Sequence, residues 1–86
     1  MKHIIVTVSN RQNTFSCDME VPVDLAGRRL LANMAEVFAV YTPQFHLDDL
    51  YCRLYIKRLG RPLEDTESLA QAGVRNGDYL TIVPRG

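Results

Sequence analysis

The chain has 86 residues, of which 47% are hydrophobic and 23% charged, and ten Lys and Arg residues balance ten Asp and Glu residues. This length allows one compact domain over residues 1–86, and these proportions are typical of an ordinary globular domain. A net charge of zero argues against a protein that coats nucleic acid or anionic lipid.

The sequence also argues against export and against a disulfide scaffold. No apolar run approaches the ~18 residues of a membrane span, and Met1 leads directly into a strand-like pattern without a signal peptide. Cys17 and Cys52 are too few for a disulfide framework or a four-ligand zinc site, and we interpret them as small core residues. We therefore expect a cytoplasmic protein.

The first elements form a predicted hairpin. Residues 2–8 alternate as a strand, with Ile4, Val6 and Val8 on one face. Residues 9–14 are a polar turn, and residues 15–21 alternate again. Two amphipathic strands joined by a short polar loop predict an antiparallel hairpin.

The hydrophobic period then changes to that of a helix, which we predict over residues 26–39. Asp24 is the expected N-cap, with Leu25 as an alternative cap position that would leave the cap unfilled. Pro22 ends the preceding strand and Pro43 ends the helix. The apolar stripe of the helix consists of Leu30, Leu31, Met34, Val37 and Phe38.

The second half of the chain returns to strands. We predict a polar connection over residues 44–50, a strand over residues 52–57 and a turn over residues 59–63. In that strand Leu54 and Ile56 face inward.

A short capped helical turn is expected over residues 64–73, ending on a left-handed glycine. A tight turn over residues 75–78 then leads into a last strand over residues 79–83. The order is two strands, a helix, a strand, a short helix and a strand. This order predicts an α+β fold in which one helix covers one face of a mixed sheet.

That order, and the residues of the second half, resemble the β-grasp fold of ubiquitin. Gly60-Arg61-Pro62-Leu63-Glu64-Asp65, followed by Ser68-Leu69 and Gly73-Val74, follows a recurring ubiquitin-like pattern. The stretch from Ala72 to Leu80 resembles the YukD/EsaB family, the ubiquitin-like components of type VII secretion systems, and also the first domain of the membrane protein EccD. Val21-Pro22-Val23 before the helix fits the same family.

The resemblance implies a non-catalytic adaptor in the export of small helical-hairpin proteins. Its implied partners are the cytoplasmic parts of the secretion machinery, either the FtsK-like ATPase or the membrane channel, with no nucleic acid and no insertion into the membrane. Recruitment to the inner face of the membrane stays open. An alternative is the excised N-terminal domain of an EccD-like protein, in which residues 84–86 would begin a linker, whereas Met1 directly before the first strand favours a free-standing chain.

A second alternative is a ubiquitin-like modifier or sulfur carrier acting through its C-terminal glycine. Such proteins need a flexible tail that ends in two glycines, because adenylating enzymes thread the backbone through a narrow channel. This tail is short, has one glycine, Gly86, and is stiffened by Pro84. We expect no adenylate, thiocarboxylate or isopeptide adduct at Gly86.

The resemblance also points to a binding face. Ubiquitin is recognised through the outward residues of its third and fifth strands, and Lys57 corresponds to the central isoleucine of that surface. A desolvated charge there predicts that ubiquitin receptors reject this chain. An ordinary solvated sheet face is the alternative. With Ile5 nearby, the expected protein-binding residues are Arg53, Tyr55, Lys57, Tyr79, Thr81 and Val83.

Other chemistry has little support in the sequence. Acidic residues follow closely after the basic residues Arg53, Lys57, Arg58 and Arg61, which predicts an ion-paired surface rather than a nucleic-acid site. His3 and His46 have no catalytic partner at a diagnostic spacing. The segment 46–49 has the residues for a weak metal site, but a polar loop explains it better. We expect no enzymatic activity, no metal and no cofactor.

Overall fold

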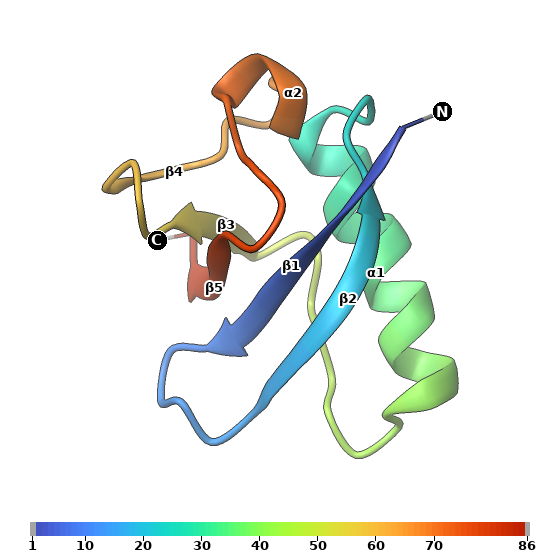
Figure 1. Ribbon diagram of the computed structural model, residues 1–86. Coiled ribbons are helices and arrows are strands. Elements are labelled where there is room, and N and C mark those ends of the chain that lie inside the picture. The colour runs from blue at the N-terminus through green and yellow to red at the C-terminus, as the bar shows by residue number, and fades with distance from the viewer. Residues whose placement is uncertain (1, 86) are drawn as a thin grey trace.

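The computed structural model describes residues 2–85 and shows one mixed sheet with one long helix against it (Figure 1). The sheet has five strands in the order β2-β1-β5-β3-β4. This confirms the predicted α+β architecture. The elements along the chain are β1 (His3–Asn10), β2 (Ser16–Pro22), α1 (Gly27–Tyr41), β3 (Cys52–Ile56), β4 (Arg61–Pro62), α2 (Leu69–Ala72) and β5 (Tyr79–Pro84).

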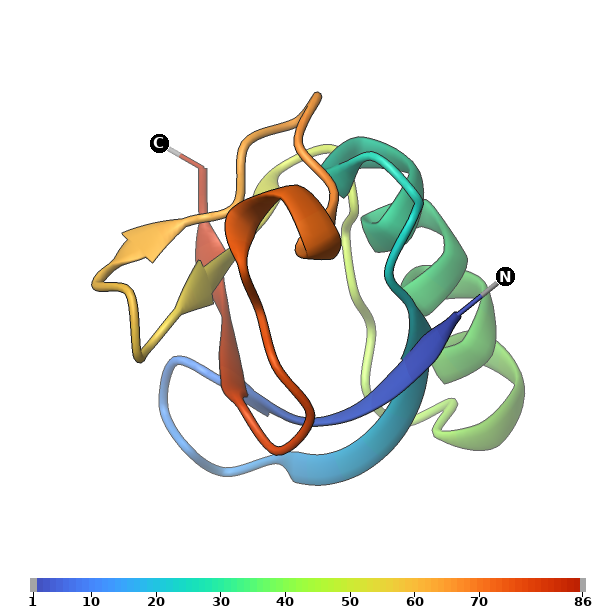
Figure 2. The ribbon, with the colours of Figure 1, turned by 45° about the horizontal axis from the view of Figure 1, so that its top comes forward.

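The first and last strands of the chain, β1 and β5, lie side by side in the sheet. β1 and β2 form the predicted antiparallel hairpin, with Val6 opposite Met19. β1 also pairs in parallel with β5, and β5 pairs antiparallel with β3. The sheet curves around α1, so that the helix lies on its concave side (Figure 2).

The buried stripe of α1 differs slightly from the predicted one. Leu30, Met34 and Phe38 are buried as expected, in one core with Val6, Leu54, Ile56, Leu69 and Leu80. Val37 was expected in this core, but it is only half-buried and lies outside it. Leu31 is buried as predicted, and the buried stripe begins at Gly27, which leaves Val37 at its margin.

Helix α1 is capped by another part of the chain, and Asp24 is not the N-cap. Ala26 occupies the cap position, and no side chain there accepts a helix N–H. The backbone of the later segment takes this role. Gly27 donates its N–H to the carbonyl of Glu67 at 2.8 Å, and the next N–H reaches the carbonyl of Asp65 at 3.0 Å. These bonds satisfy helix donors that a side chain would otherwise cap.

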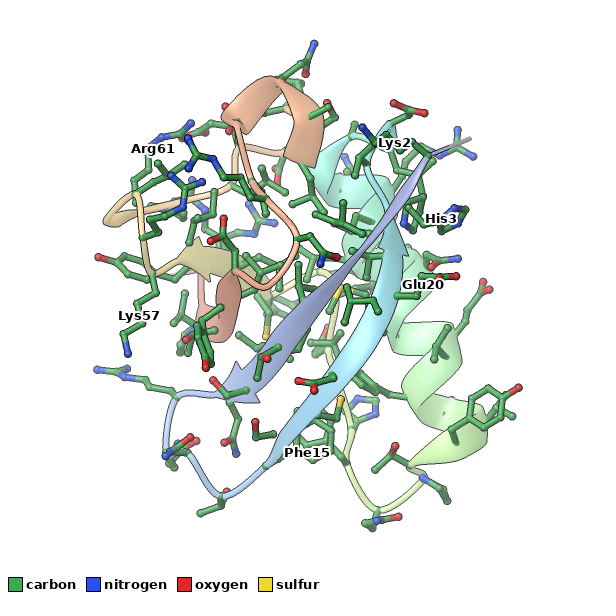
Figure 3. All side chains as sticks on the ribbon, in the orientation of Figure 1. Lys2, His3, Phe15, Glu20, Lys57 and Arg61 are labelled. Atoms are coloured by element: carbon green, nitrogen blue, oxygen red, sulfur yellow. The ribbon has the colours of Figure 1, made fainter. Side chains whose placement is uncertain are left out.

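The connection after α1 is not simply polar, as residues 44–50 were expected to be. Leu47 is buried in the core, and Phe45 stacks on Phe15 with 4.2 Å between ring centroids. Both rings lie nearly perpendicular to the ring of Phe38, with centroid distances of 5.3 Å for Phe45 and 5.5 Å for Phe15. Figure 3 shows Phe15 at the end of the hairpin that lies beside this connection.

The segment after β3 contains a strand that the sequence did not reveal. β4 lies inside the predicted turn 59–63 and pairs with the end of β3. The capped helical turn is confirmed but shorter, because α2 spans four residues. Ser68 and Gln71 form a reciprocal capping box, and Gly73 ends the helix with a φ of 83°.

Candidate protein-binding face

The predicted binding residues lie on the sheet face opposite α1, which we call the outward sheet face. Strand alternation places them there, because Leu80 and Ile82 of β5 are buried and the intervening residues point away. β3 alternates in the same way around Leu54. Lys57 follows β3 directly, and its N–H donates to the carbonyl of Tyr79 at 3.2 Å.

The strand registers bring four of the six predicted residues into one cluster. Tyr55 lies opposite Thr81, and Tyr79 lies in the next row beside Lys57. These four side chains line one shallow hollow of about 490 Å³. Tyr79 is 55% exposed and Tyr55 37% exposed, so both rings offer contact area.

The electrostatics of this hollow favour a negative group. The Nζ of Lys57 lies 5.6 Å from the centroid of the Tyr79 ring, a cation–π geometry. Lys57 extends away from the molecule in Figure 3. Arg11 lines the same hollow as a second cation, and no described carboxylate lines it. The hollow therefore combines aromatic surface with positive charge.

Two predicted residues lie outside the hollow. Arg53 and Val83 face each other across β3 and β5. The guanidinium of Arg53 pairs with Glu64 at 3.4 Å, and its side chain is only 27% exposed. Val83 is half-buried. The structure thus places both at the margin of the cluster, where Arg53 is engaged within the chain.

Arg58 and Arg61, two of the basic residues predicted to lie on an ion-paired surface, are ion-paired. Arg58 binds Asp78 at 2.9 Å and also donates to the carbonyl of Gly73 at 2.6 Å. Arg61 binds Glu67 at 2.8 Å. These hydrogen bonds hold the pKa values of both carboxyl groups below their usual range. Lys57 forms none of the salt bridges found among the described residues.

Sequence reasoning missed the contribution of β1 and its loop to the hollow. Thr7 pairs with Tyr79, Ser9 pairs with Thr81, and Ser9 and Arg11 line the hollow. The alternation of β1 already placed Thr7 opposite the core side. The parallel pairing with β5, which joins residues far apart in sequence, was needed to place Ser9 and Arg11 at the site.

The two cysteines and the segment 46–49 have structural roles. Burial raises the pKa of both the Cys17 and Cys52 thiols, which keeps them protonated, and both pack against the core. Asp48 accepts the N–H of Leu50 at 3.3 Å, as in a polar loop. Within residues 2–85 there is no group of three His, Cys, Asp or Glu side chains placed to hold a metal ion.

Arg85, the residue after β5, is hydrogen-bonded to other parts of the molecule. The guanidinium of Arg85 binds both oxygens of Asp65 at 3.1 Å and donates to the carbonyl of Cys52 at 3.2 Å. Its N–H donates to the carbonyl of Tyr51 at 2.7 Å. The expectation about the chemistry of Gly86 lies outside the described residues.

Known structures define the class of this fold. Caldiarchaeum subterraneum ubiquitin is 21% identical, with a TM-score of 0.71 over 99% of this chain and 96% of that one. The ubiquitin-like domain of Plasmodium falciparum Dsk2 is 22% identical, with a TM-score of 0.72 over 96% and 99%. A ubiquitin-like domain from Arabidopsis thaliana is 17% identical, with a TM-score of 0.73 over 100% and 81%. The fold is therefore a ubiquitin-like β-grasp.

The family is narrower than the fold. The family model described as "WXG100 protein secretion system (Wss), protein YukD" matches residues 3–82, so the chain belongs to the YukD family of secretion-related ubiquitin-like proteins. No curated protein matches the chain significantly. Among the described residues, no helix has both the length and the apolar character needed to span a membrane.

Proposed function

We propose that this protein is a non-catalytic, cytoplasmic adaptor of a WXG100 (type VII) secretion system that binds an acidic surface of the secretion machinery. Family membership supports the link to secretion. The partner is a cytoplasmic part of the system, either the FtsK-like ATPase or the membrane channel component. Tyr55, Lys57, Tyr79 and Thr81 form the centre of the contact, with Arg53 and Val83 at its margin.

The observation that carries this proposal is the composition of the hollow on the outward sheet face. Two exposed tyrosines provide rigid contact area, Lys57 and Arg11 provide positive charge, and no described carboxylate lines the hollow. Aromatic anchors with a cation are typical of protein interfaces. The unpaired charge selects an acidic partner and disfavours the apolar pockets that recognise ubiquitin.

The bonds around Arg85 favour an adaptor over a modifier or sulfur carrier. A carrier must extend its C-terminal backbone away from the domain to reach an adenylating enzyme. Here the residue after β5 is bound by Asp65 and by two backbone carbonyls. The backbone up to Arg85 therefore lies against the domain.

A binding experiment with purified components tests the proposal. The cytoplasmic segments of the ATPase and of the channel protein from the same system are immobilised separately, and capture of this protein is measured. Wild type binds one of them, and the double variant Tyr55→Ala with Lys57→Glu loses capture. Because both side chains point away from the core, the melting temperature stays near that of wild type.

The matched control lies on the other side of the molecule. Arg28 and Arg29 are exposed on α1, and replacing both with Ala removes charge without touching the outward sheet face. This control binds as wild type does. If the α1 variant loses capture while the sheet-face variant keeps it, the interface lies on the helix side and the proposed face is wrong.

A further inference from the structure

The two edges of the sheet differ in how open they are. β4 ends one side with only two residues, and Pro62 has no N–H to offer. β2 ends the other side with seven residues in an uninterrupted register against β1. No further strand of the described chain pairs with its outer side, and Figure 2 shows β2 as the outermost strand at the bottom of the view. We call this outer side the β2 edge.

The register shows which backbone groups the β2 edge presents. At one end of the ladder, the N–H of Val23 donates to the carbonyl of Lys2 at 3.1 Å. At the other end, the carbonyl of Phe15 accepts the last N–H of β1 at 3.1 Å. Antiparallel strands alternate between bonded and non-bonded pairs, so the odd-numbered residues of β2 bond to β1. The N–H and carbonyl groups of Asp18 and Glu20 therefore point outward, away from the sheet.

The side chains of β2 alternate between the two faces of the sheet. Asp18 and Glu20 are exposed, and β2 contains no cationic residue. Thr7 donates its hydroxyl to one oxygen of Asp18 at 2.6 Å, which leaves the other oxygen available. On the helix side, Cys17 and Met19 are half-buried and packed against the core. Figure 3 shows Glu20 on β2.

These charges disfavour one occupant and favour another. A second copy pairing through its own β2 edge, in the antiparallel register centred on Met19, would place Asp18 opposite Glu20 of the other copy on one face. Like charges directly opposite each other destabilise a sheet. A strand with basic residues at alternate positions would instead place opposite charges across from both carboxylates, and its other residues would lie beside Met19.

We propose that the β2 edge binds an extended segment of a partner protein in which basic and aliphatic residues alternate, and that this segment adds to the sheet as a sixth strand. Main-chain hydrogen bonds to Asp18 and Glu20 hold the segment, and their carboxylates select its charge. This surface lies on β2, whereas the proposed contact of the adaptor centres on β3 and β5. The inference therefore stands independently of the proposed function.

Short synthetic peptides test this inference on the whole chain. One peptide alternates Lys with Val, a second alternates Glu with Val, and a third has the composition of the first with its lysines consecutive. Only the first binds. Its amide chemical-shift changes centre on β2, and hydrogen exchange slows at the N–H groups of Asp18 and Glu20.

Variants separate main-chain pairing from simple charge attraction. Glu20→Pro removes an outward N–H, and Glu20→Gln removes only the charge. The proline variant loses binding, whereas the glutamine variant binds several-fold more weakly. The double variant Asp18→Lys with Glu20→Lys binds the Glu–Val peptide and binds the Lys–Val peptide about tenfold more weakly, because both cross-strand pairs become repulsive. A variant that merely unfolds would not gain this reversed preference.

Three outcomes would overturn the inference. One is equal binding of the alternating and the consecutive lysine peptides, and another is shift changes centred on Tyr55 and Tyr79. The third is self-association that Glu20→Pro abolishes, which would make a second copy the occupant. The variant Tyr55→Ala with Lys57→Glu binds the Lys–Val peptide as wild type does, so a failure here is distinct from a failure of the proposed function.

Discussion

The two connections on either side of β3 both contain buried apolar residues, but they differ in their polar contacts. The connection over residues 42–51 is anchored by apolar contacts, through Leu47 and the stack of Phe45 on Phe15. The connection over residues 57–78, which we call the polar connection, also buries Leu63, Leu69 and Val74, but it differs in its many polar contacts. These include two ion pairs, the capping box and the carbonyl groups that cap α1.

This difference shows two ways in which a small domain orders long irregular segments. Apolar anchors gain free energy in proportion to the buried area, and they depend little on pH or salt. Exposed ion pairs gain less and are weakened by acid and by salt. The polar connection also leads directly to the outward sheet face, because Arg58 and Asp78 flank Lys57 and Tyr79 in sequence.

The largest expected effect is at the centre of the apolar cluster. Phe38 is 2% exposed and meets both other phenylalanine rings. Phe38→Ala lowers the free energy of unfolding by about 3–5 kcal/mol, a large share of the stability of so small a domain. Urea unfolding measures this loss. A midpoint equal to that of wild type would show that the α1 register is wrong.

The next effect tests the close contact between α1 and the polar connection. A Cβ on Gly27 would collide with the carbonyl oxygen of Glu64 and press on the side chain of Leu63. Although alanine usually stabilises a helix relative to glycine, Gly27→Ala costs about 1–3 kcal/mol here because of this overpacking. Thermal unfolding measures this loss. Ala32→Gly, on the same helix, measures for comparison the effect of the reverse exchange. If Gly27→Ala stabilises the protein, α1 and the polar connection do not lie in this close contact.

A smaller effect isolates the apolar connection. Phe45 is half-buried, so Phe45→Ala removes part of an aromatic stack and costs about 2 kcal/mol. Amide hydrogen exchange accelerates over residues 42–51 and stays unchanged over residues 57–78. Phe45→Leu, which keeps apolar volume, recovers much of the loss. Uniform acceleration across the whole chain would show that the two connections are not anchored separately.

The smallest expected effect is a loss of folding stability at acid pH. The hydrogen bonds from Arg58 and Arg61 lower the pKa values of Asp78 and Glu67 in the folded state. Their stabilisation is therefore complete above the unfolded pKa values of about 4 and is lost as the pH falls through the lower folded values. Salt bridges at a protein surface contribute little to stability, so this effect is small.

Melting temperatures recorded across this acid range test the effect. The loss between about pH 5 and pH 2 is smaller in the double variant Asp78→Asn with Glu67→Gln than in wild type. Phe45→Ala serves as the control, because its loss in melting temperature is nearly the same at each pH. A double variant with the wild-type pH dependence would show that these carboxylates do not link stability to pH.

The same contrast explains how much the sequence could predict. Periodicity found every element whose residues alternate or recur, from the hairpin to the stripe of Met34 and Phe38. The single apolar residues Phe45 and Leu47 have no period, so their burial could not be predicted. Likewise, Asp24 is a good capping residue locally, but the donors of α1 are met by carbonyls about forty residues later in the chain. Such long-range contacts leave no local pattern.

The candidate site, like the fold, was predicted only in part. Alternation along β3 and β5 correctly placed Tyr55 and Tyr79 on the same outward face. The resemblance gave no sign that Arg53 is engaged by Glu64, because that contact depends on where the chain turns after β4. The contribution of Arg11 was also missed, because it follows from the parallel pairing of β1 with β5.

Secretion itself tests the central claim most directly. In a host that carries this system, the gene for this chain is deleted and restored as wild type, as Tyr55→Ala with Lys57→Glu, or as Arg28→Ala with Arg29→Ala. The measured quantity is the amount of WXG100 protein in the medium at equal levels of this chain. The α1 variant restores export as wild type does, and the sheet-face variant does not. Full restoration by the sheet-face variant would contradict a function carried by the outward sheet face.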